Sequence, residues 1–313
     1  MTIACSLAAT HSERAMAIST LQDTLQGLPQ IFRLPSTVPP NNAVHEHFLR
    51  PHPHSDPNSD EGPHEQHGLV TIPASSTPWT VAISESTDLS RGFVCAGVLV
   101  DPAWVLTAAH CLFSVARRWP NDSDLYVFVE SPSLSSPGRK FPVEEIVPHP
   151  EYDARALRND LALVRIDTRQ AKPGAPLPFE GPPISELIGG IGTILGWGIT
   201  TTGHVEQHND KLQILQVAIL DDEVCFSPVN FPQLRGTGVF CATPLLKYHD
   251  ICLRFGGSPM AIYSRKGALY LAGMVSWAAN CPADSRKPNV YLDIHAYAPW
   301  IRSVLGTKTG RLQ

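Results

Sequence analysis

The sequence predicts an all-β fold, with one antiparallel domain of ~245 residues, a barrel or a sandwich, that ends in a helix. Short runs rich in Val, Ile and Leu recur from about Leu69 onward, separated by Pro, Gly, Asp and Asn. Apolar residues make up 43% of the 313-residue chain and charged residues only 17%, so a sizeable core can form. Helical spacing of apolar residues is found near the C-terminal end, over residues 296–305.

Residues 1–67 differ in composition from the rest, and we expect a flexible Pro/His-rich segment in front of a domain over residues 68–313. Six histidines lie between His45 and His67, interleaved with prolines. The segment has almost no apolar periodicity between Pro35 and Pro63, so little offsets the entropy of ordering it. Loose binding of a transition metal by the histidines is the alternative interpretation.

The expected strands follow one another along the second part of the chain, each bounded by turn residues. They are residues 79–83, 93–100, 104–107, 125–130, 161–166, 191–196, 212–220 and 269–277. In the terminal segment, Tyr297, Ile301 and Leu305 repeat every four residues, which predicts a helix.

Charge, hydropathy and cysteine spacing argue against several classes of protein. The formal net charge of −5 disfavours a nucleic-acid partner, which would need a basic face. The longest mostly apolar run, 268–279, is too short for a membrane helix of roughly 20 residues. No cysteine pair has the CxxC spacing of a zinc site, so we expect no metal there and no cofactor.

Six of the seven cysteines lie in the second part. Taken two by two along the chain, the members of each pair are 16, 16 and 29 residues apart. Three sequential disulfides would each close a short or medium loop, and they would imply an oxidising, extracellular compartment. Buried free thiols in a cytosolic protein are the alternative. The N-terminus has no Lys or Arg before Arg14 and is a weak signal peptide. We therefore expect secretion from the cysteines rather than from the N-terminus.

Two short motifs place candidate catalytic groups beside strands. His110 stands in a Thr-Ala-Ala-His-Cys sequence after an expected strand, and Asp160 stands in an Asn-Asp pair at the entry to another. A Gly-Trp-Gly sequence around Trp197, a Val-Ser-Trp sequence around Ser276 and an Ala-Pro-Trp-Ile sequence around Trp300 follow in order. Together these segments resemble the trypsin/chymotrypsin-like serine proteases (peptidase S1) over residues 69–305.

The resemblance implies two packed six-stranded antiparallel β-barrels, with the active site in the cleft between them. It implies that His110 is the general base and that Asp160 is the carboxylate that fixes the tautomer of the imidazole. The disulfides that it implies are Cys95–Cys111, Cys225–Cys241 and Cys252–Cys281.

The nucleophile is the point at which the sequence departs from the family. The family pattern is Asp-x-Cys-x-Gly-Asp-Ser-Gly-Gly-Pro, whereas residues 250–259 are Asp-Ile-Cys-Leu-Arg-Phe-Gly-Gly-Ser-Pro. Gly256 therefore occupies the nucleophile position. Ser258 lies two residues further on, up to ~7 Å away along an extended chain. Because a nucleophile must lie within hydrogen-bond reach of its base, we expect that Ser258 does not serve.

Neighbouring positions depart from the family pattern as well. Arg254 replaces the glycine whose N–H helps to bind the oxyanion. Phe255 replaces the aspartate that receives the new N-terminal amine after activating cleavage. The nearest basic residue before Leu69 is Arg50, so the basic residue of an activation site is also missing. These joint losses identify the chain as a catalytically inactive serine protease homologue.

The resemblance also locates a substrate pocket. Asp250 matches the acid that binds a substrate Arg or Lys in trypsin-like relatives. Ala278 and Asn289 match wall positions that are glycine in relatives with deep pockets. We expect Asn289 to fill the pocket and to donate its amide to Asp250, because a buried carboxylate needs such partners. A surviving cation pocket is the alternative.

These features favour a secreted, non-catalytic homologue that binds a protein or peptide partner, with no nucleic acid and no membrane. The partner would be a protease, a zymogen or an inhibitor, and the chain would act as cofactor or regulator of a proteolytic cascade. The alternative is an active trypsin-like serine endopeptidase that cleaves after Arg or Lys, with Ser258 recruited and Asp250 selecting the substrate. A third hypothesis makes the histidine-rich segment the active part, binding Zn²⁺ or Cu²⁺.

Overall fold

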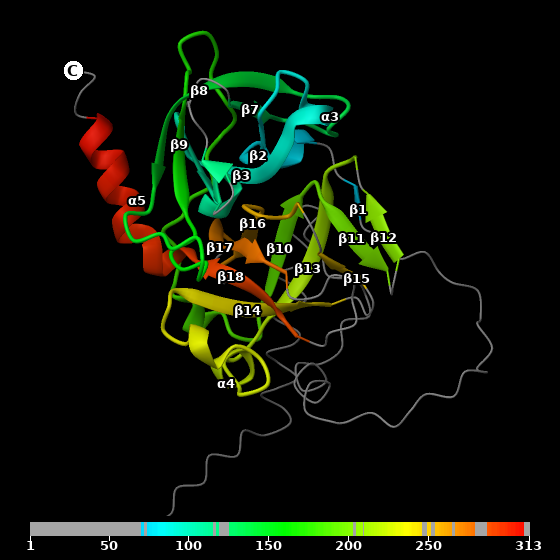
Figure 1. Cartoon of the computed structure of the whole chain (residues 1–313), viewed down its shortest axis with the longest axis vertical. Helices are drawn as coiled ribbons and strands as arrows, with labels where there is room; N and C mark the ends of the chain where they lie inside the picture. Colours follow the sequence, from blue (N-terminus) through cyan, green and yellow to red (C-terminus); the bar gives the residue numbers. More distant parts are fainter. Residues whose placement is uncertain are drawn as a thin grey trace, which may run out of the picture. The chain divides into compact units, whose positions relative to one another are not determined.

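The computed structural model describes residues 70–309 with gaps at 72–73, 115–116, 119–124, 203–204, 209, 246–248, 252–253, 265–266 and 279–286. Most of the regular elements in this part of the chain are strands, and one long helix ends it (Figure 1). The expected Pro/His-rich segment over residues 1–67 lies outside the described residues and stays a prediction.

Six antiparallel strands close into a first barrel. Apolar side chains that point inward, among them Val81, Leu99 and Val164, are fully buried and form its core. Burial of such a side chain contributes ~1.5–3 kcal/mol, so the barrel interior is the main source of its stability. In order of pairing the strands are β2 (Thr80–Ser84), β3 (Phe93–Asp101), β4 (Trp104–Thr107), β9 (Ala162–Ile166), β8 (Arg139–Pro148) and β7 (Tyr126–Val129), which pairs with β2 again.

A second barrel of six antiparallel strands follows. It closes where β13 pairs with β14, with Val217 opposite Pro244. Its core contains Phe240 stacked on Tyr291, with ring centroids 5.5 Å apart. In order of pairing the strands are β13 (Gln213–Ile219), β10 (Ile191–Gly196), β16 (Pro259–Tyr263), β17 (Leu269–Trp277), β18 (Asn289–Asp293) and β14 (Val239–Pro244).

Shorter strands and turns lie outside the two barrels. β1 (Val70–Thr71) pairs with β13, and β5 (Phe113–Ser114) pairs with β6 (Arg117–Arg118). β11 (Ile199–Thr202) lies between β12 (Val205–His208) and β15 (His249–Ile251) in a small sheet. The short helical segments are η2 (Ala74–Ser76), α3 (Leu89–Gly92), η3 (Ala109–Cys111), η5 (Ile184–Glu186), α4 (Asp222–Cys225) and η6 (Pro232–Leu234).

The terminal helix α5 (Ile294–Thr309) is longer than the expected range of 296–305. It packs against β17, and its buried residues include Tyr297, Ile301 and Val304. The four-residue spacing in the sequence therefore marks the face that the helix buries.

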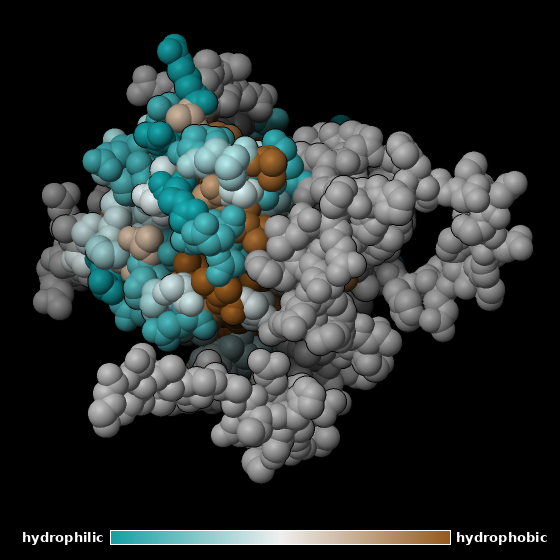
Figure 2. All heavy atoms as spheres, turned by 90° about the horizontal axis from the view of Figure 1, so that it is seen from below, coloured by the Kyte–Doolittle hydropathy of each residue, from teal (hydrophilic) through white to brown (hydrophobic). Residues whose placement is uncertain are grey.

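The predicted fold class is confirmed: the chain has two closed six-stranded antiparallel barrels and one C-terminal helix. Strands β8, β14, β16 and β18 lie outside the expected strand ranges. Seen from below, the described surface is mostly hydrophilic, with a narrow hydrophobic strip (Figure 2).

Two disulfides tie neighbouring elements together. Cys95–Cys111 joins β3 to η3, and Cys225–Cys241 joins α4 to β14. The pair Cys252–Cys281, which the family resemblance implies, lies outside the described residues and stays a prediction.

Replacing both Cys225 and Cys241 by serine is expected to lower the free energy of unfolding by about 3 kcal/mol. The disulfide spans 16 residues, and closing a loop of that length removes a corresponding entropy from the unfolded chain. Urea denaturation of the variant beside the oxidised wild type measures the difference. A loss under about 1 kcal/mol would contradict this loop-entropy account.

Candidate functional site

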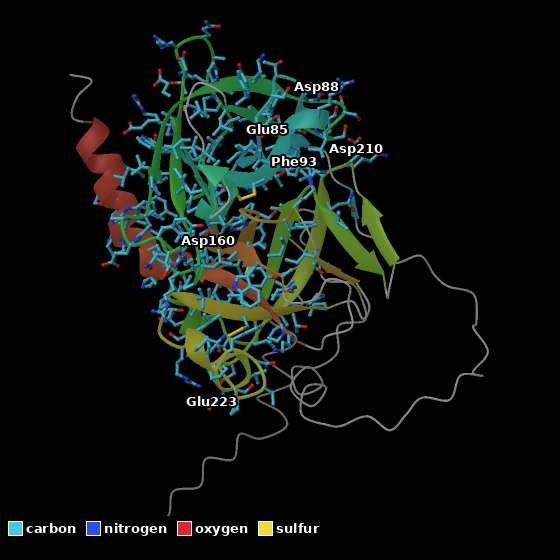
Figure 3. The ribbon with its side chains drawn as sticks, in the orientation of Figure 1. Glu85, Asp88, Phe93, Asp160, Asp210 and Glu223 are labelled. Atoms are coloured by element: carbon cyan, nitrogen blue, oxygen red, sulfur yellow. A yellow bond between two sulfur atoms is a disulfide. The ribbon has the colours of Figure 1, made fainter. Side chains whose placement is uncertain are left out.

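A buried carboxylate lies where the two barrels meet (Figure 3). Asp160 precedes β9 and is fully buried. Its Oδ1 accepts a hydrogen bond from the backbone N–H of His110 at 2.8 Å, and its Oδ2 lies 2.8 Å from Nδ1 of the His110 ring. The hydroxyl of Ser276, on β17 of the second barrel, donates to the same Oδ2 at 2.6 Å. The charge of Asp160 is thus held by three donors from both barrels.

This arrangement sets the tautomer of His110. A carboxylate accepts hydrogen bonds and does not donate them, so the proton of the neutral ring lies on Nδ1, facing Asp160. Nε2 is then left with a lone pair on the side away from the carboxylate. Burial lowers the pKa of His110, but the hydrogen bond to Asp160 and the charge of that carboxylate together outweigh it, and the pKa is raised above 6.5.

Gly256 lies directly against the free side of the imidazole. A Cβ atom placed on Gly256 would be 2.6 Å from Nε2 and 2.9 Å from Cε1 of His110, and 3.2 Å from Sγ of Cys95. Contacts under 3.0 Å are closer than van der Waals packing allows, so the ring stands in the space that a side chain at this position would need. The backbone of Gly256 is fixed there by the hydrogen bond from the N–H of Ala96 to its carbonyl, at 3.1 Å.

The hydroxyl of Ser258 forms no hydrogen bond with the imidazole. Ser258 is fully buried, and its Oγ lies against Gly196 in the second barrel, so close that a Cβ on Gly196 would collide with it. Among the described residues Oγ has no hydrogen-bond partner. The carbonyl of Ser258 accepts from Val275, and its N–H donates to Phe255, which fixes the turn in this orientation.

Arg254 reaches across from the same turn to the first barrel. Its backbone has a φ of 69°, a left-handed conformation that residues other than glycine seldom adopt. Its Nη2 donates to the carbonyl of Phe93 on β3 at 2.9 Å, and its guanidinium lies 5.1 Å from the centre of the Phe93 ring. Phe93 in turn packs edge-on against Trp197. The Arg254 side chain therefore links the turn before β16 to β3 of the first barrel.

Phe255 belongs to the interior of the second barrel. It is 1% exposed and lies in a cluster of apolar residues that includes Ile194, Val217 and Ile251. A buried ammonium placed in such surroundings would have no counter-charge, which is costly.

The residues expected to form the substrate pocket are described only in part. Asp250 pairs with Thr201 through the backbone of β15, and its side chain lies outside the described residues. Asn289 is fully buried on β18, and Ala278 is half buried against the core of the second barrel. The bond that we expect between Asn289 and Asp250 therefore stays a prediction.

The role of Ser276 does not follow from the Val-Ser-Trp motif that contains it. A serine inside the apolar run 269–277 is nevertheless a signal for a buried hydrogen bond. The two cysteine sulfur atoms near His110 belong to the Cys95–Cys111 disulfide. They therefore offer no thiolate, which is the form that binds a metal.

Comparison with known proteins gives one family. A model of the Trypsin family matches residues 67–301. Serine protease 56 of Homo sapiens is 30% identical over 249 residues, which are 78% of this chain and 39% of that protein. Trypsin of Phaedon cochleariae is 29% identical over 215 residues, 66% of this chain and 77% of that protein. Transmembrane protease serine 11C of Mus musculus is 31% identical over 242 residues, 73% of this chain and 51% of that protein.

The chain thus spans well under half of the human relative and about half of the mouse one. None of the helices in the described part of the chain is long and apolar enough to cross a membrane.

Replacing Asp160 by Asn is expected to lower the pKa of His110 below 6.5. The substitution removes the charge that raises this pKa and leaves the burial that lowers it. In the wild type, the raised pKa stabilises the fold below about pH 6.5, and this contribution is lost as the pH rises through the folded-state value. NMR titration of the His110 ring measures the shift, and an unchanged pKa in the variant would contradict the assignment.

Replacing Gly256 by Ala is expected to destabilise the fold by about 1–3 kcal/mol, as overpacking of a close-packed site does. The imidazole is held by Asp160 and can make room only by stretching that bond. Gly306→Ala is the matched control, because a Cβ there meets nothing within 4 Å. Chemical denaturation of both variants makes the comparison. Equal stability of the two would show that the ring does not occupy this space.

Proposed function

This chain belongs to the trypsin family of serine proteases, and we propose that it is a non-catalytic member that acts by binding a protein or peptide. The partner would be a protease, a zymogen or an inhibitor, and the chain would serve as cofactor or regulator of a proteolytic cascade. The observation that supports the proposal is the position of Gly256, at which a Cβ atom would lie 2.6 Å from Nε2 of His110. The imidazole of His110, at the position of the family's general base, faces the backbone of Gly256, which carries no hydroxyl.

The magnitude of the catalytic loss supports this proposal. A site of this type that lacks a member of its triad keeps only ~10³–10⁴-fold acceleration over water. This residual activity depends on hydrogen-bond donors that are arranged to bind the oxyanion. Here the turn carries Arg254 with its guanidinium tied to the Phe93 carbonyl, and Phe255 in place of a carboxylate. The proposed cleft therefore has neither a nucleophile nor the usual surroundings of one.

Retention of His110 and Asp160 has a structural explanation that needs no hydrolysis. Removing one partner from a buried ionic hydrogen bond leaves an uncompensated charge, which costs about 3–5 kcal/mol. Asp160 is fully buried and relies on His110 for two of its hydrogen bonds. In our proposal the pair is kept because His110 satisfies the buried carboxylate to which Ser276 of the second barrel bonds.

We also propose that the chain works outside the cell. The two disulfides support this, because such bonds persist in oxidising compartments. The name of the mouse relative includes the word transmembrane, so an anchor in a longer protein is compatible with the proposal.

The second candidate function is an active endopeptidase that cleaves after Arg or Lys, with Ser258 as nucleophile and Asp250 selecting the substrate. The retained His110–Asp160 pair favours it. Against it stands the orientation of Ser258, whose buried Oγ lies against Gly196. Metal binding by the histidine-rich segment concerns residues outside the described part and stays a prediction.

Incubating the full chain with a fluorophosphonate probe is expected to give no covalent labelling, and a fluorogenic Arg peptide should stay uncleaved. Gly256→Ser is the informative companion variant. It is expected to stay inactive as well, because its side chain collides with the His110 ring and Arg254 still crosses the cleft. A relative with trypsin activity serves as positive control. Labelling of the wild type at Ser258, found by mass spectrometry, would overturn the proposal.

A further inference from the structure

We propose that the chain binds a zinc ion between His110, Cys95 and Cys111 once a dithiol reductant has opened the disulfide that joins the two cysteines. In the oxidised chain the two sulfurs are bonded to each other and offer no thiolate. The dithiol gives two electrons and two protons to the disulfide and becomes a disulfide itself, and the two new thiols release their protons as the ion binds. This inference goes beyond the proposed function and does not rest on it.

Three donor atoms of the kind that zinc prefers lie close together in the fold. A ring nitrogen of His110 and the sulfurs of Cys95 and Cys111 all lie within 4.8 Å of one another. Nε2 of His110 is 3.8 Å from Sγ of Cys111. A zinc ion with bonds of ~2.0–2.1 Å to nitrogen and ~2.3 Å to sulfur, at a near-tetrahedral angle, holds those two atoms ~3.6–3.8 Å apart. Nitrogen and sulfur therefore already stand at the separation that the ion needs.

Asp160 gives the imidazole the orientation of a metal ligand. A histidine that binds a metal almost always donates its other ring N–H to a carboxylate, a carbonyl or water, which fixes the tautomer. Nδ1 of His110 lies 2.8 Å from Oδ2 of Asp160, and Ser276 donates to the same oxygen at 2.6 Å. Nε2 thus keeps its lone pair for the ion.

The missing side chain at Gly256 leaves room for the ion. A Cβ atom placed there would lie 2.6 Å from Nε2 of His110 and 3.2 Å from Sγ of Cys95. No side-chain atom fills this space between the two donors, because glycine has none. Once Cys95 is released from the disulfide, we expect its side chain to rotate and to bring the sulfur to bonding distance.

Hydrogen bonds that do not involve sulfur hold the three ligands in place. Cys95 lies within β3, which is paired with β2. The N–H of His110 donates to Asp160 at 2.8 Å, and the N–H of Cys111 donates to the carbonyl of Ala108 at 3.2 Å. The His110 side chain is 31% exposed and Cys111 is half-buried, so a reductant and an ion can reach them. We therefore expect the donors to stay together when the disulfide opens.

The donor set selects the metal. Thiolate and imidazole ligands suit Zn²⁺, whereas Ca²⁺ and Mg²⁺ take oxygen ligands. Three protein ligands leave one position for water or another exchangeable ligand, as in zinc sites of the Cys₂His type. The two cysteines are 16 residues apart, so only the fold brings them together with the histidine.

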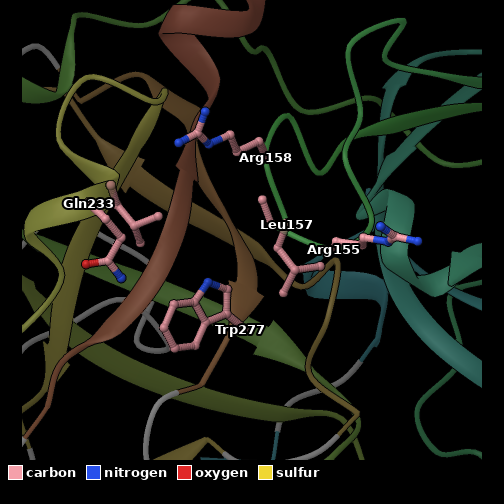
Figure 4. Close-up of a pocket in the computed structure, with 7 residues that line it drawn as sticks. Arg155, Leu157, Arg158, Gln233 and Trp277 are labelled. Atoms are coloured by element: carbon pink, nitrogen blue, oxygen red, sulfur yellow. The ribbon is translucent and has the colours of Figure 1, made fainter. Parts of the chain in front are cut away.

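The pocket beside Trp277 offers the ion no rival site (Figure 4). Among the described residues, no His, Cys, Asp or Glu lines it, and its two charged side chains are Arg155 and Arg158. Two guanidiniums repel a cation, so the ion is not drawn into this neighbouring space.

Titration of the dithiol-reduced full chain with Co²⁺, a spectroscopic substitute for Zn²⁺, tests the inference. We expect a thiolate-to-cobalt charge-transfer band and the intense visible bands of tetrahedral Co²⁺, both removed by added Zn²⁺. The oxidised chain is the control, and only the difference between the two states counts, since Cys5 and the histidines of residues 1–67 are present in both. Absence of the difference band, or loss of the fold on reduction by circular dichroism, would overturn the inference.

Alkylation with iodoacetamide, mapped by mass spectrometry, identifies the ligands. In the reduced chain, Zn²⁺ is expected to protect Cys95 and Cys111 and to leave the alkylation of Cys225 and Cys241 unchanged. Equal protection of both pairs would contradict the site, because it would show binding to whatever thiols are exposed.

Two substitutions test the surroundings of the ion. Gly256→Ala is expected to abolish the zinc protection, because its Cβ takes the space between the imidazole and the sulfur. Gly306→Ala is the matched control, since a Cβ there meets nothing within 4 Å. Asp160→Asn should weaken Co²⁺ binding about 10–100-fold, as loss of a carboxylate behind a metal-bound histidine does. Undiminished binding by both variants would place the ion elsewhere and refute the inference.

Discussion

The buried charge of Asp160 is the constraint on which the cleft depends. A carboxylate taken out of water must be fully hydrogen-bonded, and this one draws its donors from both barrels. His110 supplies two from η3 on the first barrel, and Ser276 supplies the third from β17 on the second. The requirement is electrostatic and exists whether or not a substrate is ever cleaved. Because of it, His110 satisfies the Asp160 carboxylate to which Ser276 of the second barrel also bonds.

The turn over residues 254–258 shows how the rest of the cleft has adapted to this fixed pair. With no side chain at Gly256, the imidazole lies against the backbone. The left-handed conformation at Arg254 sends its guanidinium to the Phe93 carbonyl, and Phe255 fills the interior of the second barrel. Under our proposal of a non-catalytic chain, each of these residues takes up space or polarity that hydrolysis would use.

Much of this arrangement could be predicted from the sequence, because short motifs in a specific order align the chain with the trypsin-like serine proteases. The two barrels, the nearness of His110 to Asp160 and the position of Gly256 beside the ring all follow from it. Strand β8 could not be found by apolar runs, because Lys140, Pro142 and Glu144 alternate with its buried Phe141 and Val143. The apolar run around Ser276 likewise does not reveal that its hydroxyl bonds to Asp160. That bond depends on how one barrel is set against the other, which no local pattern encodes.

The bridge from Arg254 to Phe93 bears on how hydrolysis could return, in evolution, to the non-catalytic chain that we propose. A serine gained at position 256 alone would meet the His110 ring, while the Arg254 guanidinium would still be bonded to the Phe93 carbonyl. Under our proposal, a return of activity would therefore need several coordinated substitutions rather than one.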